Sequence, residues 1–222
     1  NLMRGGNPGM LNRQIETLPA AIFETHPRLY TAKAWAILLM GQLEDVELLL
    51  EAAKNSAAYQ EDVELRRSID STGLNLQAIV ARGAEEVQKS INLSQEALRL
   101  LPEENIQMRA ILYLGLGSSY NMLGNLEAAK RAASEVLELV EEVDSIFLQV
   151  QALIGWAAIT NRELDLRQSA SLYQHALSLL EAHQLMYTPT AALIYTSLGD
   201  LAFDRYELDQ AEAYYQQALD LA

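Results

Sequence analysis

Apolar residues recur along most of this chain at the three- and four-residue spacing of one face of an amphipathic α-helix. The stretch 126–140 shows the pattern clearly. Its apolar stripe consists of Leu126, Ala129, Ala133, Val136, Leu137 and Val140. Charged residues such as Glu127, Lys130 and Glu135 fall on the opposite face. The two-residue alternation of β-branched residues that marks strands is weak throughout, so the pattern predicts an all-α protein.

The periodicity divides the chain into helices that begin or end at prolines, glycines and polar breaks. The predicted helices are 11–18, 28–40, 43–55, 61–82, 84–100, 104–123, 126–141, 145–162, 165–182, 190–204 and 207–222. Short breaks join successive helices, which predicts that neighbours pack antiparallel. The predicted pairs are 28–55, 61–100, 104–141, 145–182 and 190–222, within one domain over 1–222.

The pairs repeat with a period of about 40 residues. Each pair has a turn at a corresponding position, and a small residue recurs at a fixed distance beyond that turn. The turn positions are Gly41, Glu85, Gly124, Leu164 and Tyr206, and the small residues are Ala53, Ala97, Val136, Ala176 and Ala218. A small side chain at the same place in every repeat indicates that two helices approach closely there.

The third pair carries the tetratricopeptide signature most completely. Leu116-Gly117 and Tyr120 precede the turn residue Gly124, and Ala129 follows at a packing position. HEAT and armadillo repeats share the period, but this spacing favours the tetratricopeptide type. We therefore predict a right-handed superhelical solenoid of about five antiparallel helix pairs. The chain stops within a second helix with no polar cap after it, which predicts a fragment of a larger protein.

Composition narrows the range of partners. The formal net charge of −14 disfavours contact with a nucleic-acid backbone, which requires clustered Lys and Arg. The absence of cysteine excludes disulfides, and no apolar stretch approaches the length of a membrane-spanning helix. We expect a cytoplasmic segment that contacts neither membrane nor nucleic acid.

Residues that carry catalytic or metal chemistry do not form a recognisable set. Gly115 and Gly117 imitate part of a dinucleotide fingerprint, but the third glycine and the preceding strand are missing. Asp200 and Asp204 are spaced to share a helix face but have no third metal ligand in the sequence pattern. We expect no enzyme activity, no catalytic or metal-binding residues and no cofactor.

The inner face of the predicted solenoid is the candidate binding surface, because the first helix of each pair lines it. Polar residues expected on this face are Asn75, Arg82, Asn121, Gln151, Asn161, Arg162, Thr196 and Asp200. Asn121 and Asn161 are one repeat apart, so we expect them on neighbouring inner helices, pointing the same way. Asparagine can donate and accept hydrogen bonds, but it is also common near helix ends, so helix capping is the alternative role.

Two stretches carry a resemblance to a known family. The first is the Leu-Pro, His-Pro-Arg-Leu and Gly-Gln-Leu series within 15–43, and the second is 97–120, with its Ala, Pro and Leu-Gly-x-x-Tyr positions. Both are similar to the repeat region of the large MalT-like, LuxR-type transcriptional regulators of bacteria. The resemblance implies an ATPase domain before the repeats and a helix-turn-helix domain after them. It also implies a repeat region that senses an inducer, which is a small sugar in the best-known member.

No Walker A loop or recognition helix is evident here, so we expect this segment neither to hydrolyse ATP nor to bind DNA. The first hypothesis is an effector-sensing and protein-interaction domain of a transcriptional regulator. Its partner would be a small-molecule inducer or a regulatory protein or peptide, and self-association is left open. The alternative is a general scaffold that grips a peptide or helix in its concave groove.

Overall fold

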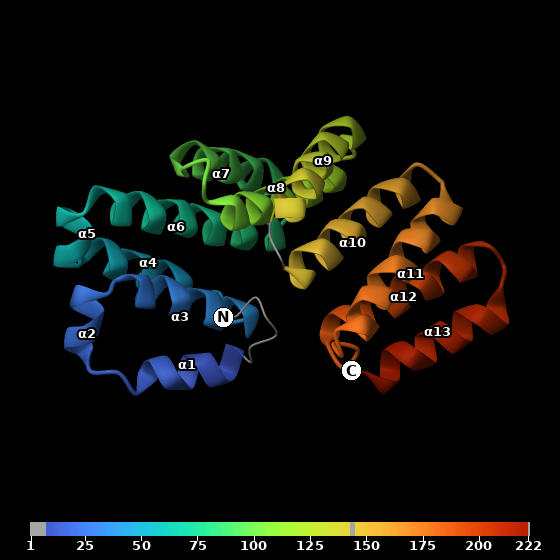
Figure 1. Ribbon diagram of the computed structural model, residues 1–222, viewed down its shortest axis with the longest axis horizontal. Helices are drawn as coiled ribbons and strands as arrows, with labels where there is room; N and C mark the ends of the chain where they lie inside the picture. The colour runs from blue at the N-terminus through green and yellow to red at the C-terminus, as the bar shows by residue number, and fades with distance from the viewer. Residues whose placement is uncertain (1–7, 143–144, 222) are drawn as a thin grey trace.

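The computed structural model describes residues 8–142 and 145–221, and the regular structure within these ranges is entirely helical (Figure 1). The helices are α1 (Pro8–Glu16), α2 (Ala20–Thr25), α3 (Arg28–Leu39), α4 (Val46–Asn55), α5 (Ala57–Glu61), α6 (Val63–Gly83), α7 (Val87–Leu100), α8 (Ile106–Met122), α9 (Leu126–Glu142), α10 (Ile146–Arg162), α11 (Leu166–Ala182), α12 (Pro189–Asp204) and α13 (Leu208–Asp220). The prediction of an all-α chain is confirmed. In the described ranges, no helix has both the length and the apolar character needed to cross a membrane.

Consecutive helices pack in pairs, and each pair packs against the next. The pairs are α3 with α4, α6 with α7, α8 with α9, α10 with α11, and α12 with α13. Contacts of α7 with α8, α9 with α10 and α11 with α12 join successive pairs. Figure 1 shows the pairs following an arch from the blue N-terminal end to the red C-terminal end. This architecture is the predicted tetratricopeptide-like solenoid.

The turn inside each pair is made by a residue in the left-handed conformation, at the position that the repeat predicts. The φ angles are 79° at Gly41, 63° at Glu85, 73° at Gly124, 64° at Leu164 and 60° at Tyr206, and Gln184 adds a further such turn between α11 and α12, with a φ of 58°. In the α8–α9 turn, the Gly124 N–H donates to the Asn121 carbonyl and the Asn125 N–H donates to the Tyr120 carbonyl. This is the Schellman pattern, which closes a helix end with backbone groups alone.

The recurring small residues lie where paired helices cross. Ala53, Ala97, Val136 and Ala176 have no exposed surface, and Ala218 is 9% exposed. Larger residues from both helices of a pair surround these positions. In the C-terminal core, for example, Ala176 is clustered with Leu153 of α10 and Leu180 of α11. The prediction of close helix approach at this repeat position is confirmed.

The N-terminal third departs from the predicted helices at two places. Residues 20–25 and 57–61 form the short helices α2 and α5, which the periodicity did not predict, and α4 begins at Val46 rather than at 43. A helix of five or six residues is too short to show an apolar period. Capping explains the break instead, because Ser56 Oγ accepts from the Tyr59 N–H and Asp62 accepts from the N–H groups of Glu64 and Leu65.

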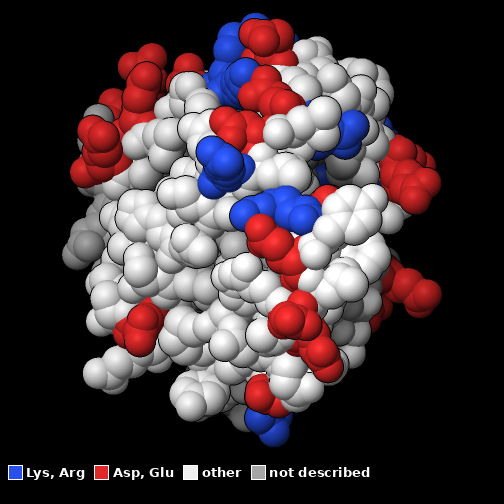
Figure 2. All heavy atoms as spheres, turned by 90° about the vertical axis from the view of Figure 1, so that its right-hand side faces the viewer, with Lys and Arg blue, Asp and Glu red and all other residues white. Residues whose placement is uncertain are grey.

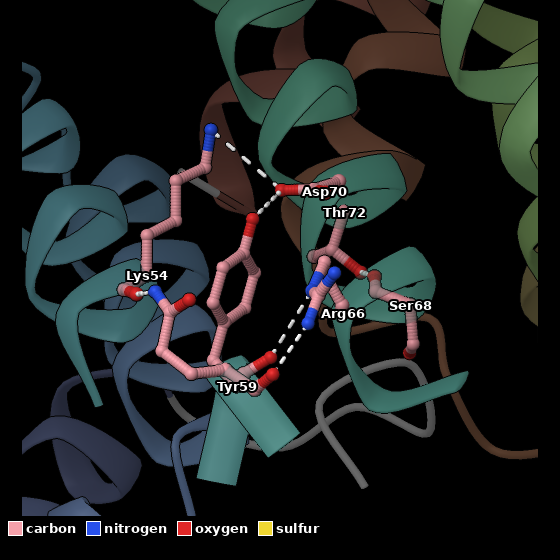
Figure 3. Close-up of polar contacts among 7 residues, drawn as sticks. Lys54, Tyr59, Arg66, Ser68, Asp70 and Thr72 are labelled. Carbon is pink, nitrogen blue, oxygen red and sulfur yellow. Dashed lines mark hydrogen bonds and ion pairs between the residues drawn. The ribbon is translucent and has the colours of Figure 1, made fainter. Parts of the chain in front are cut away.

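A cluster of polar contacts joins α4 and the short helix α5 to α6 (Figure 3). The Tyr59 hydroxyl donates to Asp70 Oδ1 at 2.8 Å, and Lys54 Nζ lies 3.6 Å from the same oxygen. Arg66 of α6 donates to the carbonyls of Tyr59 and Gln60 in α5. These two hydrogen bonds join the end of α5 to the first turn of α6. Burial and the hydrogen bond to Asp70 raise the pKa of Tyr59 to about 12.

Candidate functional site

The first helices of successive pairs surround a hollow on the inner side of the solenoid. Its cavity volume is about 700 Å³, within the range of small-molecule binding sites. Its walls come from α3, α6, α8 and α10, with Ala133 and Val136 of α9 at the back. The cavity therefore belongs to several repeats at once.

The second helices differ in side-chain size at one repeat position. The corresponding residue of each later second helix, counted from its turn, is Ser94 in α7, Ala133 in α9, Tyr173 in α11 and Tyr215 in α13. Tyr173 is 6% exposed and belongs to the C-terminal core, and the Tyr215 ring lies directly over Gly199. The small side chain of Ala133 leaves the equivalent space open, and Ala133 lines the cavity.

Residues without a side chain widen the hollow further. Gly115 and Gly117 of α8 and Gly155 of α10 all line it. A Cβ atom at Gly155 would meet no atom within 4 Å, so this glycine faces open space. At Gly117 a Cβ would make ordinary contacts, 3.7 Å from the Ala132 Cβ and 3.8 Å from the Ala129 carbonyl oxygen. Gly117 thus lies at a helix crossing, as expected, but the space would also accept alanine.

The wall of the cavity is predominantly apolar. Six of its larger apolar side chains are those of Trp35, Ile79, Ile111, Leu114, Phe147 and Ile154. They are half-buried, apart from Phe147, which is 39% exposed. An apolar wall of this kind favours ligands that bring apolar surface out of water.

A few polar side chains also line the cavity, and several of them belong to the residues expected on the inner binding surface. Asn75, Arg82, Asn121 and Gln151 line the cavity. Asn75 is 2% exposed, and its Nδ2 lies 3.9 Å from Met108 Sδ as a weak hydrogen bond. The Asn121 Oδ1 atom is buried without a hydrogen-bond partner. Their assignment as ligand contacts stays a prediction.

Arg82 supplies the positive charge of the cavity wall. It lies in the last turn of α6, and Nη1 donates to the Gly115 carbonyl at 3.5 Å, a long bond. Among the described residues, the ion pairs of this protein involve other cations, and none includes Arg82. Burial lowers the pKa of the Arg82 guanidinium from its ordinary value. The group nevertheless stays charged at neutral pH, because its ordinary pKa is so high.

The remaining expected residues lie outside the cavity. The carbonyls of Asn121 and Asn161 accept equivalent turn hydrogen bonds, yet only the Asn121 side chain reaches the wall. Arg162 follows Asn161 at the exposed end of α10. Thr196 Oγ1 donates to the Ala192 carbonyl in its own helix, and Asp200 accepts from the Tyr215 hydroxyl at 2.8 Å. The last two thus have local structural partners in the α12–α13 pair.

The sequence reasoning missed the apolar wall, although a signal for it exists. The second helix α9 has one apolar stripe, whereas the inner helices α8 and α10 carry apolar residues on more than one face. A helix that is apolar all round needs a second surface that covers it. In α8 and α10, one side packs against the neighbouring helices and another lines the cavity.

Acidic residues outnumber basic ones in this chain, with 30 Asp and Glu against 16 Lys and Arg. Figure 2 shows the side that lies at the right in Figure 1, where basic side chains stand beside acidic ones and a broad uncharged area covers the lower left. No continuous basic patch is visible on this face. Within 8–142 and 145–221, no group of three His, Asp or Glu side chains is arranged to hold a metal ion.

Comparison with known proteins places most of the chain in one family. The family model described as the MalT-like TPR region matches residues 74–222. The chain is 21% identical to the HTH-type transcriptional regulator MalT of Vibrio parahaemolyticus over 97% of its length, and 25% identical to that of Vibrio cholerae over 90%. It spans about a quarter of these curated relatives, 24% and 23% respectively.

Solved structures resemble the fold at low sequence identity. BtubC from P. vanneervenii matches with a TM-score of 0.66 at 16% identity, over 97% of this chain and 86% of that one. A signal transduction ATPase with numerous domains from Pyrococcus horikoshii, which carries a tetratricopeptide repeat sensor, matches with a TM-score of 0.62 at 19% identity, over 88% of this chain and 31% of that one. These likenesses support the solenoid fold.

Proposed function

Because this chain belongs to the MalT-like TPR region family, we propose that it is the effector-sensing repeat region of a bacterial transcriptional regulator. The observation that carries the proposal is the cavity of about 700 Å³ whose walls come from α3, α6, α8 and α10 together. A single hollow walled by four helices suits a compact ligand better than an extended peptide. The relatives are transcriptional regulators, and one structural neighbour is described as containing a repeat sensor.

The shared walls suggest how binding would be communicated. Each pair of a solenoid contacts only its neighbours, so its curvature depends on how the pairs are rotated against one another. A ligand that touches α6, α8 and α10 at once binds more tightly to one of these arrangements than to others. Its binding then shifts the population toward that arrangement. In the larger protein, this shift would alter the contacts of the domains attached to the repeats.

The first experiment is a thermal-shift screen of this chain against metabolites, sugars and short peptides. A ligand at a hundred times its dissociation constant should add about 2.7 kcal/mol to the free energy of unfolding, which is several degrees in a chain of this size. Gly155→Leu should reduce the shift, because it places a leucine side chain in the cavity at a position where a Cβ would meet no atom within 4 Å.

Ser171→Leu is the matched control, because it adds a leucine on the exposed side of α11. It should leave the shift unchanged. Hits whose affinity is unchanged by Gly155→Leu would show that ligands bind elsewhere and would contradict the proposal. Binding restricted to peptides would favour a protein-binding scaffold instead. In the intact regulator, Gly155→Leu should also remove the transcriptional response to the effector.

A further inference from the structure

The charge on Arg82 has no carboxylate partner among the described residues. The sequence contains 30 Asp and Glu against 16 Lys and Arg, so carboxylates are abundant. Even so, Arg82 forms no ion pair with any described carboxylate. A partly buried guanidinium loses hydration, and a structure normally compensates for that loss with an anion. The opening beside Arg82 is the cavity that it lines.

The neighbouring helix is shaped to accommodate the guanidinium. A Cβ atom at Gly115 would lie 3.4 Å from Arg82 Nη1, so the missing side chain lets the guanidinium lie against α8. The single long hydrogen bond to the Gly115 carbonyl uses one of five N–H donors. The other donors stay available for a group in the cavity, and a carboxylate can accept two of them in parallel.

The surroundings of Arg82 define the rest of the ligand. Thr72, Asn75, Ile79 and Arg82 follow one another at helical spacing on α6 and all line the cavity. The same cavity is lined by the apolar side chains of the wall, including Trp35 and Ile154. One cation in an otherwise mostly apolar cavity matches a molecule with one anionic end and an apolar body.

We propose that the cavity binds a small organic carboxylate with a largely apolar body, and that Arg82 binds the carboxylate group. This inference rests on the proposed sensing function and specifies the chemical class of the effector. It differs from the sugar that the family resemblance implies. A neutral sugar would leave the guanidinium without a counter-charge and would place many hydroxyl groups against an apolar wall.

Isothermal titration with matched probes tests the proposal. The carboxylates are 4-phenylbutyrate, octanoate and indole-3-propionate, and the control for each is its uncharged primary amide. Acetate tests the carboxylate without an apolar body, and maltose tests a neutral sugar. At least one carboxylate should bind about tenfold or more tightly than its amide, as expected for hydrogen bonds to a charged group. Acetate and maltose should bind far more weakly.

Variants of Arg82 test whether this residue causes the preference for carboxylate over amide. Arg82→Gln should remove the preference for carboxylate over amide, while Arg82→Lys keeps the charge and should retain part of it. Arg162→Gln is the matched control, since Arg162 also lies in the last turn of an inner helix but outside the cavity. Circular dichroism melts establish that each variant is folded. If Arg82→Gln does not fold, the comparison of wild type with Arg82→Lys and of acid with amide still decides the question.

Equal affinity for acids and amides, or a carboxylate preference that survives Arg82→Gln, would overturn the proposal. So would the failure of all three carboxylates to bind, or a preference for maltose. None of these results would by itself contradict effector sensing, which fails if ligand affinity is unchanged by Gly155→Leu or if only peptides bind. The two proposals therefore stand or fall on different measurements.

Discussion

The α8–α9 and α12–α13 pairs share the same repeat framework but use its interior differently. Gly117 and Gly199 occupy the same position before the turn, and Ala133 and Tyr215 the same position after it. In α12–α13 the Tyr215 ring fills the space over Gly199, with its Cε1 atom only 2.5 Å from where a Cβ would stand. In α8–α9 the small Ala133 leaves a cavity. In these two pairs, a large residue at this position covers the glycine of the partner helix, and a small one lines the cavity.

The largest effect is expected where tyrosine fills this position most completely. Tyr173→Ala should lower the free energy of unfolding by about 3–5 kcal/mol, because it removes a buried ring that is 6% exposed and leaves a hollow. Urea denaturation followed by circular dichroism measures the change. Tyr187→Ala is the control, since Tyr187 is 91% exposed, and it should change stability by less than about 0.5 kcal/mol.

The glycines of the two pairs should respond in opposite ways to a single methyl group. Gly199→Ala forces the Tyr215 ring to move, and overpacking should outweigh the gain in helix propensity, for a net loss of about 1–2 kcal/mol. Gly117→Ala should be neutral or stabilising by up to about 1 kcal/mol. Combining Gly199→Ala with Tyr215→Ala should cancel the overpacking. Additive losses in that double mutant would show that the ring is not the cause.

The turns offer a comparison between glycine and a larger residue at one backbone conformation. Leu164 holds a φ of 64° while 82% of its surface is exposed, so Leu164→Gly should stabilise the protein by about 1 kcal/mol. Thermal melting should rise by about 2–4 °C. Leu123→Gly provides the contrast, because Leu123 has a φ of −73° just before Gly124 and is 51% exposed. That change should lower the melting temperature.

The smallest expected effect lies in the open cavity itself. Gly155→Ala should stabilise the protein by about 0.5–1 kcal/mol, because alanine favours the helix and its methyl group enters empty space. Differential scanning calorimetry can detect this shift. A loss of stability would mean that the space beside Gly155 is smaller than the structure shows.

Much of the fold could be predicted because every repeat has a turn and a small buried residue at corresponding positions. The turn positions and the small crossing residues follow from periodicity, and the structure places Leu164 and Ala176 in those roles as fully as Gly124 and Ala97. The helices α2 and α5 could not be found in this way, because their few residues are governed by caps rather than by a period.

The cavity could be predicted only in part. Helical register places Asn75, Arg82, Asn121 and Gln151 on inner helices, and all four line the cavity. Thr196 has the same kind of position on α12, yet it lies outside, because the cavity is closed by the convergence of α3, α6, α8 and α10. That convergence depends on rotations between pairs, which accumulate over several repeats and leave no local mark in the sequence.

The left-handed turn residues other than glycine each carry a small cost in stability. Glu85, Leu164, Gln184 and Tyr206 hold a conformation that glycine would adopt at lower cost, and the turns still close through backbone hydrogen bonds. Selection removes only substitutions that bring stability below the level needed for function, so small costs of this kind persist. The turns lie in different repeats, and their costs should add independently. Replacing these residues by glycine, one turn at a time, should therefore raise the free energy of unfolding without altering the cavity.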